Sequence, residues 1–195
     1  METQRRPGGR SARVRDAVRQ ATLVEVTQRG YQGLTVENVA KRSGVHKTSI
    51  YRRWGSPEGL VADALELAAA EPIPIPDTGS LDGDLRAITE AVRAGFASPH
   101  GGAIGCAFIL AGMQNPAAAA ALQNFTAARR KQSVVVVERA VARGEVSESI
   151  DAEELIRFAL APIYYRIFVT HEPVTAADAV KAADAALTAA RAGIL

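Results

Sequence analysis

The stretch that decides the fold is Thr35–Trp54, which reads TVENVAKRSGVHKTSIYRRW. Its spacing is typical of a helix-turn-helix, in which the second helix crosses the first over a small residue, here Ala40. Gly44 lies where the tight turn needs a positive φ, which glycine adopts without steric cost. Three apolar side chains are expected to point inward and fix the angle between the helices: Val39, Val45 and Ile50. The sequence therefore predicts a helix-turn-helix spanning about Val36 to Trp54.

Charge is distributed unevenly along the 195 residues, although the formal net charge is only +2. Residues 1–59 carry 12 Lys and Arg against 5 Asp and Glu, whereas residues 60–195 carry 11 against 16. A basic end joined to an acidic remainder is the electrostatic pattern of a nucleic-acid-binding region attached to a region with another task. An anionic membrane surface would attract the same basic end, so charge alone does not identify the partner.

Start and stop signals divide the chain into helices. Ser11 is expected to cap the first helix and Gly30 to close it, while Thr35 and Ser56 cap the second and the fourth. The run Val134–Val137 is β-branched, but its flanks are helical, so it is kept inside a helix. Helices are expected at about 11–29, 36–43, 46–53, 57–70, 81–97, 99–113, 116–143, 152–169 and 176–192. The prediction is an all-α fold of about nine helices.

The clearest boundary is Glu71–Ser80, in which alternate residues Pro72, Pro74 and Pro76 forbid a helix and favour a stiff, extended connection. Residues 1–70 are therefore expected to form a helix-turn-helix DNA-binding domain of three helices and their supporting elements. A basic N-terminal arm that includes Arg5, Arg6 and Arg10 precedes its first helix. Residues 71–195 are expected to form a helical domain for effector binding and dimerisation.

Around the motif, the sequence resembles the TetR family of repressors. The elements that carry the resemblance are Thr35, Val39-Ala40, Gly44-Val45, Ile50-Tyr51-Arg52, Trp54, and Glu58 with Leu60-Val61. The match is dense over about residues 11–70, and Tyr51 and Trp54 distinguish this family from other helix-turn-helix proteins. In the second half, Glu138–Val146 and Ala161–Pro173 resemble one subgroup of TetR C-terminal domains. The resemblance implies a dimeric repressor that binds a palindromic operator and releases it when a small ligand binds.

Seven residues are candidates for DNA contact: Thr35, His46, Lys47, Thr48, Ser49, Tyr51 and Arg52. The resemblance implies phosphate contacts for Lys47 and Tyr51, and base-edge contacts for His46, Thr48 and Ser49 near the start of the recognition helix. Arg52 is expected to contact either a base or a phosphate. Thr35 either binds a phosphate or only caps its helix. The Tyr51 ring either contacts DNA or packs against the core of the DNA-binding domain.

Two neighbouring positions complete this expectation. Many family members have a lysine that meets a phosphate where this chain has Pro57, so that contact is missing or comes from backbone amides. Arg42 is expected to be a solvated charge rather than a contact to the DNA backbone.

A head of this size reads only a short half-site, so useful affinity requires a dimer with recognition helices about 34–36 Å apart, or a multiple of that. The resemblance implies that the last two helices pair with their copies as a four-helix bundle. The candidate interface residues are Leu155, Ala159, Ile163, Ala179, Ala183, Ala186 and Leu187. The alternative is that these apolar faces only close the chain's own core.

The resemblance also implies an effector cavity enclosed by helices 81–97, 99–113 and 116–143. Six aromatic or adaptable residues are candidates to line it, each with plain core as the alternative: Phe96, Phe108, Met113, Phe125, Tyr164 and Tyr165. Few charges fall on the inward faces, so a mostly apolar small molecule is expected. His100 and His171 lack metal-ligand spacing, and neither a metal nor a cofactor is expected.

Other classes of function fit less well. No GxGxxG, GxxxxGK[ST], GxSxG or HExxH pattern is found, so an enzyme is not expected. No apolar run has the length of a membrane span, and no secretory signal is recognised. Together with the single Cys106, expected to be buried, this favours a cytoplasmic protein that does not bind membranes. The alternative function is a helix-turn-helix protein without a small-molecule effector, controlled by a protein partner.

Overall fold

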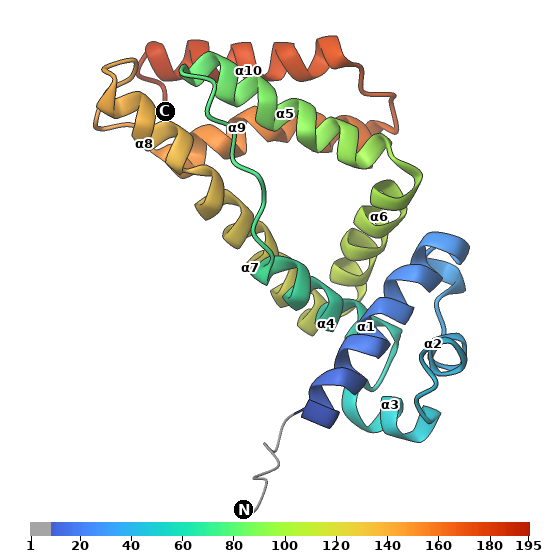
Figure 1. The fold of residues 1–195 in the computed structure, drawn as a ribbon. Coiled ribbons are helices and arrows are strands. Elements are labelled where there is room, and N and C mark those ends of the chain that lie inside the picture. Colours follow the sequence, from blue (N-terminus) through green and yellow to red (C-terminus); the bar gives the residue numbers. More distant parts are fainter. Residues whose placement is uncertain (1–8) are drawn as a thin grey trace, which may run out of the picture. The chain divides into compact units, whose positions relative to one another are not determined.

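The computed structural model describes residues 9–195, and in this part of the chain all regular secondary structure is helical, without a strand (Figure 1). Arg5 and Arg6 of the predicted basic arm lie outside the described residues. The α-helices are α1 (Gly9–Arg29), α2 (Val36–Ser43), α3 (Lys47–Trp54), α4 (Pro57–Ala70), α5 (Leu81–Ala97), α6 (Pro99–Gln114), α7 (Pro116–Ser133), α8 (Val135–Ala142), α9 (Ala152–Tyr165) and α10 (Ala176–Arg191). A 3₁₀ turn, η1 (Tyr31–Gly33), follows α1, and a π-helix, η2 (Arg166–Thr170), follows α9. The predicted all-α class is confirmed.

Side-chain caps start several of these helices. The Thr35 hydroxyl accepts a hydrogen bond from the Asn38 amide at 3.1 Å, which satisfies one of the unpaired donors at the start of α2. At α10, Thr175 and Asp178 form a reciprocal capping box. The prediction for Ser11 is wrong, because α1 already begins at Gly9 and the Ser11 hydroxyl accepts a hydrogen bond from Arg53 instead.

The predicted helix over 116–143 is two helices, because Val134 interrupts it between α7 and α8. Val134 keeps right-handed helical angles, and its carbonyl accepts from both Val137 and Glu138. The β-branched run is therefore helical as predicted, with one tightened turn.

The predicted helix over 152–169 also changes character near its end. Pro162 lies inside α9 and has no N–H to donate to the carbonyl four residues earlier. Four residues after it, at Arg166, the chain continues as η2, a π-helix that is followed by His171 with a left-handed backbone of φ 54°. This π-helix was not predicted from the sequence.

The described residues form two compact units. The first, called the head unit, contains the described residues up to Ala68 together with Ala103–Phe125. The second, called the body unit, contains Ala69–Gly102 and Thr126–Leu195. The segment Ala103–Phe125, which joins most of α6 to the first half of α7, thus belongs to the same unit as the helix-turn-helix.

The head unit has one apolar core. Val18 from α1, Val39 from α2, Ile50 from α3 and Leu65 from α4 are all completely buried in it. The α6–α7 segment adds alanines and aromatic rings to the same core. A Cβ on Gly112 of α6 would lie 3.1 Å from the Leu122 side chain of α7, so these two helices approach closely.

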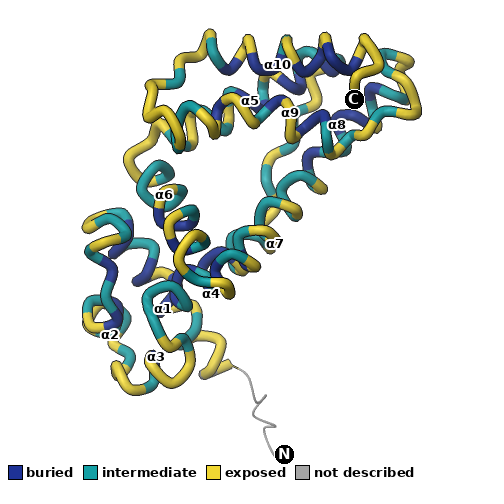
Figure 2. Tube along the Cα trace, turned by 180° about the vertical axis from the view of Figure 1, so that it is seen from behind, coloured by how far each residue is buried: buried dark blue, intermediate teal, exposed yellow. Residues whose placement is uncertain are grey.

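In the body unit, α5, α9 and α10 lie side by side, and α8 packs on α5 (Figures 1 and 2). All seven side chains that the sequence assigned to a dimer interface are buried here within the chain itself: Leu155, Ala159, Ile163, Ala179, Ala183, Ala186 and Leu187. Small alanines on α10 permit close packing of that helix against its neighbours. The assignment of these seven to a surface is therefore corrected, and they take the alternative role of core residues.

The proline-containing linker Glu71–Ser80 is extended, as the alternate prolines predict. Side chains of α7 and α8 hold it along its length. The Ile73 amide donates to Gln132 at 3.2 Å, and the Arg139 guanidinium donates to the Pro76 carbonyl at 3.0 Å. The linker is therefore an ordered part of the body unit rather than a free spacer.

Candidate DNA-binding surface

The recognition helix α3 presents polar groups to solvent and one apolar residue to the core. Lys47, Thr48 and Arg52 are exposed, and Ser49 is half-buried. Ile50 is completely buried, which fixes the rotation of the helix about its own axis. His46 precedes the helix as its N-cap residue, with its side chain exposed and not used as a cap. Four of the predicted base or phosphate contacts thus lie on one accessible surface together with His46.

Two glycines make the turns around α3 possible. Gly44 ends α2 in the left-handed conformation, with φ 68° and ψ 12°, as the motif predicts. Gly59, in the first turn of α4, lies so close to α3 that a Cβ there would collide with the Trp54 carbonyl oxygen. The requirement at Gly59 was not recognised from the sequence, because it depends on how the end of α3 meets α4.

A buried carboxylate holds α2 against α1. Glu25 is 3% exposed, and its Oε1 accepts a hydrogen bond from Arg42 at 2.6 Å. Arg29, on the same helix as Glu25, lies 2.8 Å from the other carboxylate oxygen. Arg42 was expected to be a solvated charge; it is exposed, and it is in addition the ion-pair partner that a buried glutamate requires.

A second buried carboxylate anchors α4 to α1. Asp63 is 7% exposed, and it accepts hydrogen bonds from Arg19 and Arg15, both at 2.6 Å. Burial by itself raises the pKa of Asp63, but the bonds from Arg19 and Arg15, helped by one from Trp54, lower it overall. These contacts fix the middle of α4 against α1, and the bond from Trp54 ties the end of α3 to the same carboxylate.

Tyr51 links the recognition helix to α2. Its side chain is 46% exposed, so the ring is not buried in the head, and its hydroxyl donates to Oε1 of Glu37 at 3.1 Å. This hydrogen bond, more than any burial, raises the pKa of Tyr51. Glu37 was not among the residues singled out from the sequence. The signal that could have found it is its place in the first turn of α2, two residues after Thr35.

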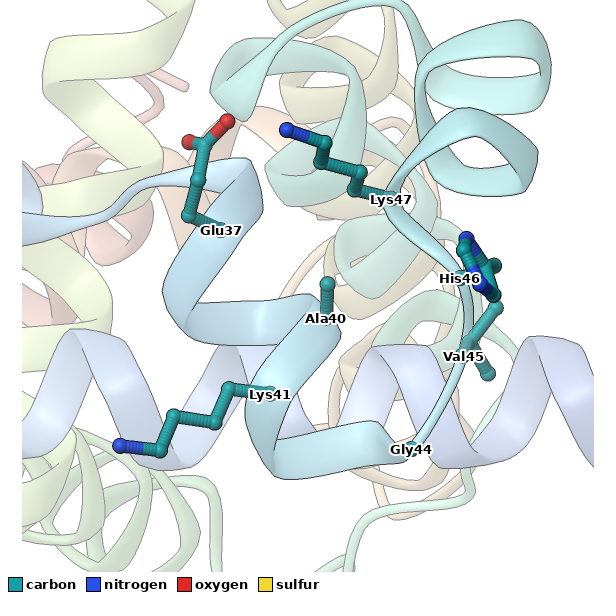
Figure 3. Close-up of a pocket in the computed structure, with 7 residues that line it drawn as sticks. All are labelled: Glu37, Ala40, Lys41, Gly44, Val45, His46 and Lys47. Atoms are coloured by element: carbon teal, nitrogen blue, oxygen red, sulfur yellow. The ribbon is translucent and has the colours of Figure 1, made fainter.

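A shallow groove separates α2 from α3 (Figure 3). It is lined by Glu37, Ala40, Lys41, Gly44, Val45, His46 and Lys47. In Figure 3 the Glu37 carboxylate and the Lys47 ammonium extend toward each other across it. The small Ala40 side chain leaves this groove open, which adds to its predicted role at the helix crossing.

The six predicted effector contacts are not brought into one cluster. Phe108 and Phe125 pack edge to face within the head unit, with ring centroids 6.0 Å apart. In the body unit, Phe96 meets Tyr164 at 5.6 Å and Phe168 at 5.3 Å, and Phe168 is a residue that the sequence analysis missed. Burial raises the pKa of Tyr164. The remaining two, Met113 and Tyr165, are exposed.

Several smaller expectations can also be compared with the described residues. Among them, no group of three or more His, Cys, Asp or Glu side chains is arranged to hold a metal ion. No single helix within residues 9–195 is long and apolar enough to cross a membrane, although α5 and α6 reach that length and hydropathy as a bent pair. Cys106 is exposed, so its predicted burial is wrong.

Comparison with known proteins places this surface in a family. Residues 19–64, which contain the helix-turn-helix, match the family described as bacterial regulatory proteins, tetR family. Residues 75–186 match the tetracyclin repressor-like C-terminal domain. The chain belongs to the TetR family. It is accordingly a DNA-binding transcription regulator of the helix-turn-helix type and not an enzyme.

Relatives within the TetR family cover most of the chain. The HTH-type transcriptional regulator AqdR of Rhodococcus erythropolis is 32% identical over 162 residues, which are 83% of this chain and 77% of AqdR. The HTH-type transcriptional regulator YdeS of Bacillus subtilis is 29% identical over 81% of this chain and 80% of its own. Among solved structures, the TetR family transcription regulator SCO0332 is 28% identical, with a TM-score of 0.70 over 90% of this chain and 97% of that one.

Proposed function

We propose that this TetR-family regulator is a homodimeric repressor that binds a palindromic operator and releases it when a small, mostly apolar ligand binds. Residues 1–70 would act as the DNA-binding domain and residues 71–195 as the effector-binding and dimerisation domain. The protein would act in the bacterial cytoplasm, where the DNA is. The observation that carries the proposal is the rigid presentation of α3, whose exposed side is basic and polar while Ile50 locks its inner side.

Seven side chains are proposed to make the DNA contacts: Thr35, His46, Lys47, Thr48, Ser49, Tyr51 and Arg52. Lys47 would bind a phosphate through its ammonium, and the exposed Tyr51 ring would pack against the DNA backbone while its hydroxyl proton stays with Glu37; both contacts position the protein without reading sequence. His46, Thr48 and Ser49 would meet base edges from the start of the recognition helix. Thr35 caps α2 through its hydroxyl, and the backbone amides of the first turn of α2 would bind a phosphate, as helix N-termini bind anions.

The dimer is proposed to use the outer faces of α9 and α10, since the inner faces are occupied by core. Exposed residues recur at helical spacing along each of the two helices, and in Figure 2 the exposed positions of α10 lie along its outer side. On α9 they are Phe158, Ala161 and Tyr165, and on α10 they are Ala177, Val180 and Thr188. Phe158 is 41% exposed and Tyr165 is 57% exposed, which are large apolar surfaces to leave in water.

The effector is proposed to bind in the body unit against the aromatic cluster of Phe96, Tyr164 and Phe168. Rings that meet edge to face favour an apolar or aromatic ligand. The cluster joins α5 to the end of α9 and to η2, and π-helical turns are frequent at functional sites.

Two measurements test this function. Thermal unfolding in the presence of a small-molecule library identifies ligands, because a compound that binds the native state raises the melting temperature. Each such ligand is then titrated into the complex with DNA. A coupling of about 1–3 kcal/mol lowers DNA affinity about 5- to 150-fold. Unchanged affinity at saturating ligand would contradict effector release, and release by a protein partner instead would support control by that partner.

A further inference from the structure

An acidic side chain lies within the otherwise basic surface that faces DNA. Between Val36 and Trp54 the sequence has a single acidic residue, Glu37, against five basic ones, Lys41, Arg42, Lys47, Arg52 and Arg53. Glu37 is exposed and lines the groove between α2 and α3 (Figure 3). A carboxylate at this place repels the phosphates of DNA and weakens nonspecific binding. A favourable contact elsewhere must therefore offset the DNA affinity that Glu37 costs.

Stabilisation of α2 explains only in part why an acidic residue stands at position 37. An acidic residue in the first turn of α2 interacts favourably with the helix dipole, and this is worth about 0.3–1 kcal/mol on an exposed surface. Thr35 already caps the same helix through its hydroxyl. The Glu37 side chain, however, extends away from the α2 amides to the recognition helix, where Oε1 accepts from the Tyr51 hydroxyl.

This hydrogen bond orients the Glu37 carboxylate but occupies only one of its two oxygens. A tyrosine hydroxyl has one proton to donate, and here Oε1 of Glu37 receives it. Within the described residues, no hydrogen bond or ion pair to the second oxygen, Oε2, is found. A carboxylate has lone pairs for several donors, so Glu37 presents an oriented acceptor beside the residues expected to contact DNA.

The chemistry of the major groove limits what such an acceptor can recognise. Guanine presents N7 and O6 and thymine presents O4, all of them acceptors that a carboxylate repels. Cytosine presents its N4 amino group, which is the group that Glu and Asp accept from. Adenine also presents an amino group, but its N7 acceptor lies next to it.

We propose that Glu37 is a specificity-determining residue that reads a cytosine in each half-site of the operator. Tyr51 positions the carboxylate through its hydroxyl, while Oε2 accepts from the cytosine amino group. The residue then lowers affinity for DNA in general and restores it at the correct sequence, which widens the ratio of specific to nonspecific binding. The inference rests on the operator binding proposed above.

Selection of bound sequences from random double-stranded DNA tests the inference with three full-length proteins: the wild type, Glu37→Gln and Glu66→Gln. Glu66 is the matched control, because it is an exposed carboxylate of the head unit whose loss changes the charge equally. We expect a cytosine in each half-site for the wild type and Glu66→Gln, favoured about 5- to 150-fold over other bases. Glutamine pairs with adenine N6 and N7, so Glu37→Gln is expected to move that preference toward adenine and leave the other positions unchanged.

The outcomes separate this inference from the function on which it rests. Melting curves first establish that both variants fold like the wild type. A wild-type motif that Glu37→Gln leaves unchanged at every position overturns the inference alone. The same holds if both variants bind all sequences more tightly without a change in base preference, since that is a charge effect. Failure of the wild type to enrich any sequence overturns the operator proposal and this inference together.

Discussion

Lys47 is the first residue of α3, and its exposed ammonium is the simplest phosphate contact in the head. Lys47→Ala is expected to weaken binding to all DNA sequences by a similar factor, because a phosphate contact carries no sequence information. It should also reduce the slope of log affinity against log salt concentration by about 1, since one fewer counterion is released.

Lys131→Ala serves as the control for this slope, because it removes an exposed lysine from α7 in the body unit. Binding of both variants to one duplex is measured at several salt concentrations. An unchanged slope for Lys47→Ala would mean that its ammonium does not neutralise a phosphate.

Asp63 is the residue on which the stability of the head is expected to depend most. Asp63→Ala leaves Arg19 buried without its partner, which is expected to cost about 3–5 kcal/mol in the free energy of unfolding. Asp16→Ala, on the exposed side of α1, is expected to change it by less than about 0.5 kcal/mol. Chemical denaturation of both variants measures the difference, and equal stabilities would contradict the role of the ion pair.

The same residue gives the head a pH dependence. The pKa of Asp63 is lower in the folded protein than in the unfolded chain, so its ion pairs stabilise the fold at neutral pH. This contribution is lost as the pH falls from the ordinary aspartate value, near 4, through the lower folded pKa. Melting temperature measured against pH should therefore fall below about pH 4 in the wild type, and less steeply in Asp63→Asn.

Individual residues of the site were predictable where a local rule fixes them. Thr35 as a cap, Gly44 as a left-handed turn and Ile50 as core each follow from a short sequence pattern, and all three are found. Arg42, Glu37 and Gly59 were misjudged or missed because their roles depend on residues of another helix: Glu25, Tyr51 and Trp54. Sequence spacing within one helix carries no information about these partners.

At the scale of single helices, the capping box of α10 makes a direct prediction. Thr175→Ala removes the hydroxyl that accepts from the Asp178 amide and is expected to destabilise the protein by about 1 kcal/mol. Thr27→Ala in α1 is the control, because its hydroxyl bonds only to the Leu23 carbonyl within the same helix. Chemical denaturation measures the free energy of unfolding of both variants. An equal decrease in the two would show that the cap at Thr175 contributes nothing.

The sequence predicted where helices begin better than where they are interrupted or which partner their apolar sides pack against. The start of α2 follows from its cap Thr35, the starts of α5 and α10 lie where they were expected, and the extended linker follows from its prolines. The interruption at Val134 and the π-helix after Pro162 depend on how the turns pack, which short-range signals do not contain. The side of α10 that carries Ala183 and Ala186 was correctly seen as apolar, but only the structure assigns it to the chain's own core.

At the scale of the whole molecule, the proposed dimer depends on exposed apolar side chains. The double variant Phe158→Ser, Tyr165→Ser is expected to sediment as a monomer at concentrations where the wild type is a dimer, because it removes two large apolar groups from the interface. Met113→Ser removes a side chain that is 79% exposed but lies in the head unit, and it should remain dimeric. A dimeric double variant would place the interface elsewhere.

Sequence selection from random DNA by the wild-type protein tests the central claim most directly, because it reports DNA binding, specificity and dimer geometry together. The account predicts an enriched palindrome whose two half-site centres lie about 10–10.5 base pairs apart, or a multiple of that, so that two copies of α3 meet the same face of the duplex. A single asymmetric site, or no enrichment above random sequence, would contradict it.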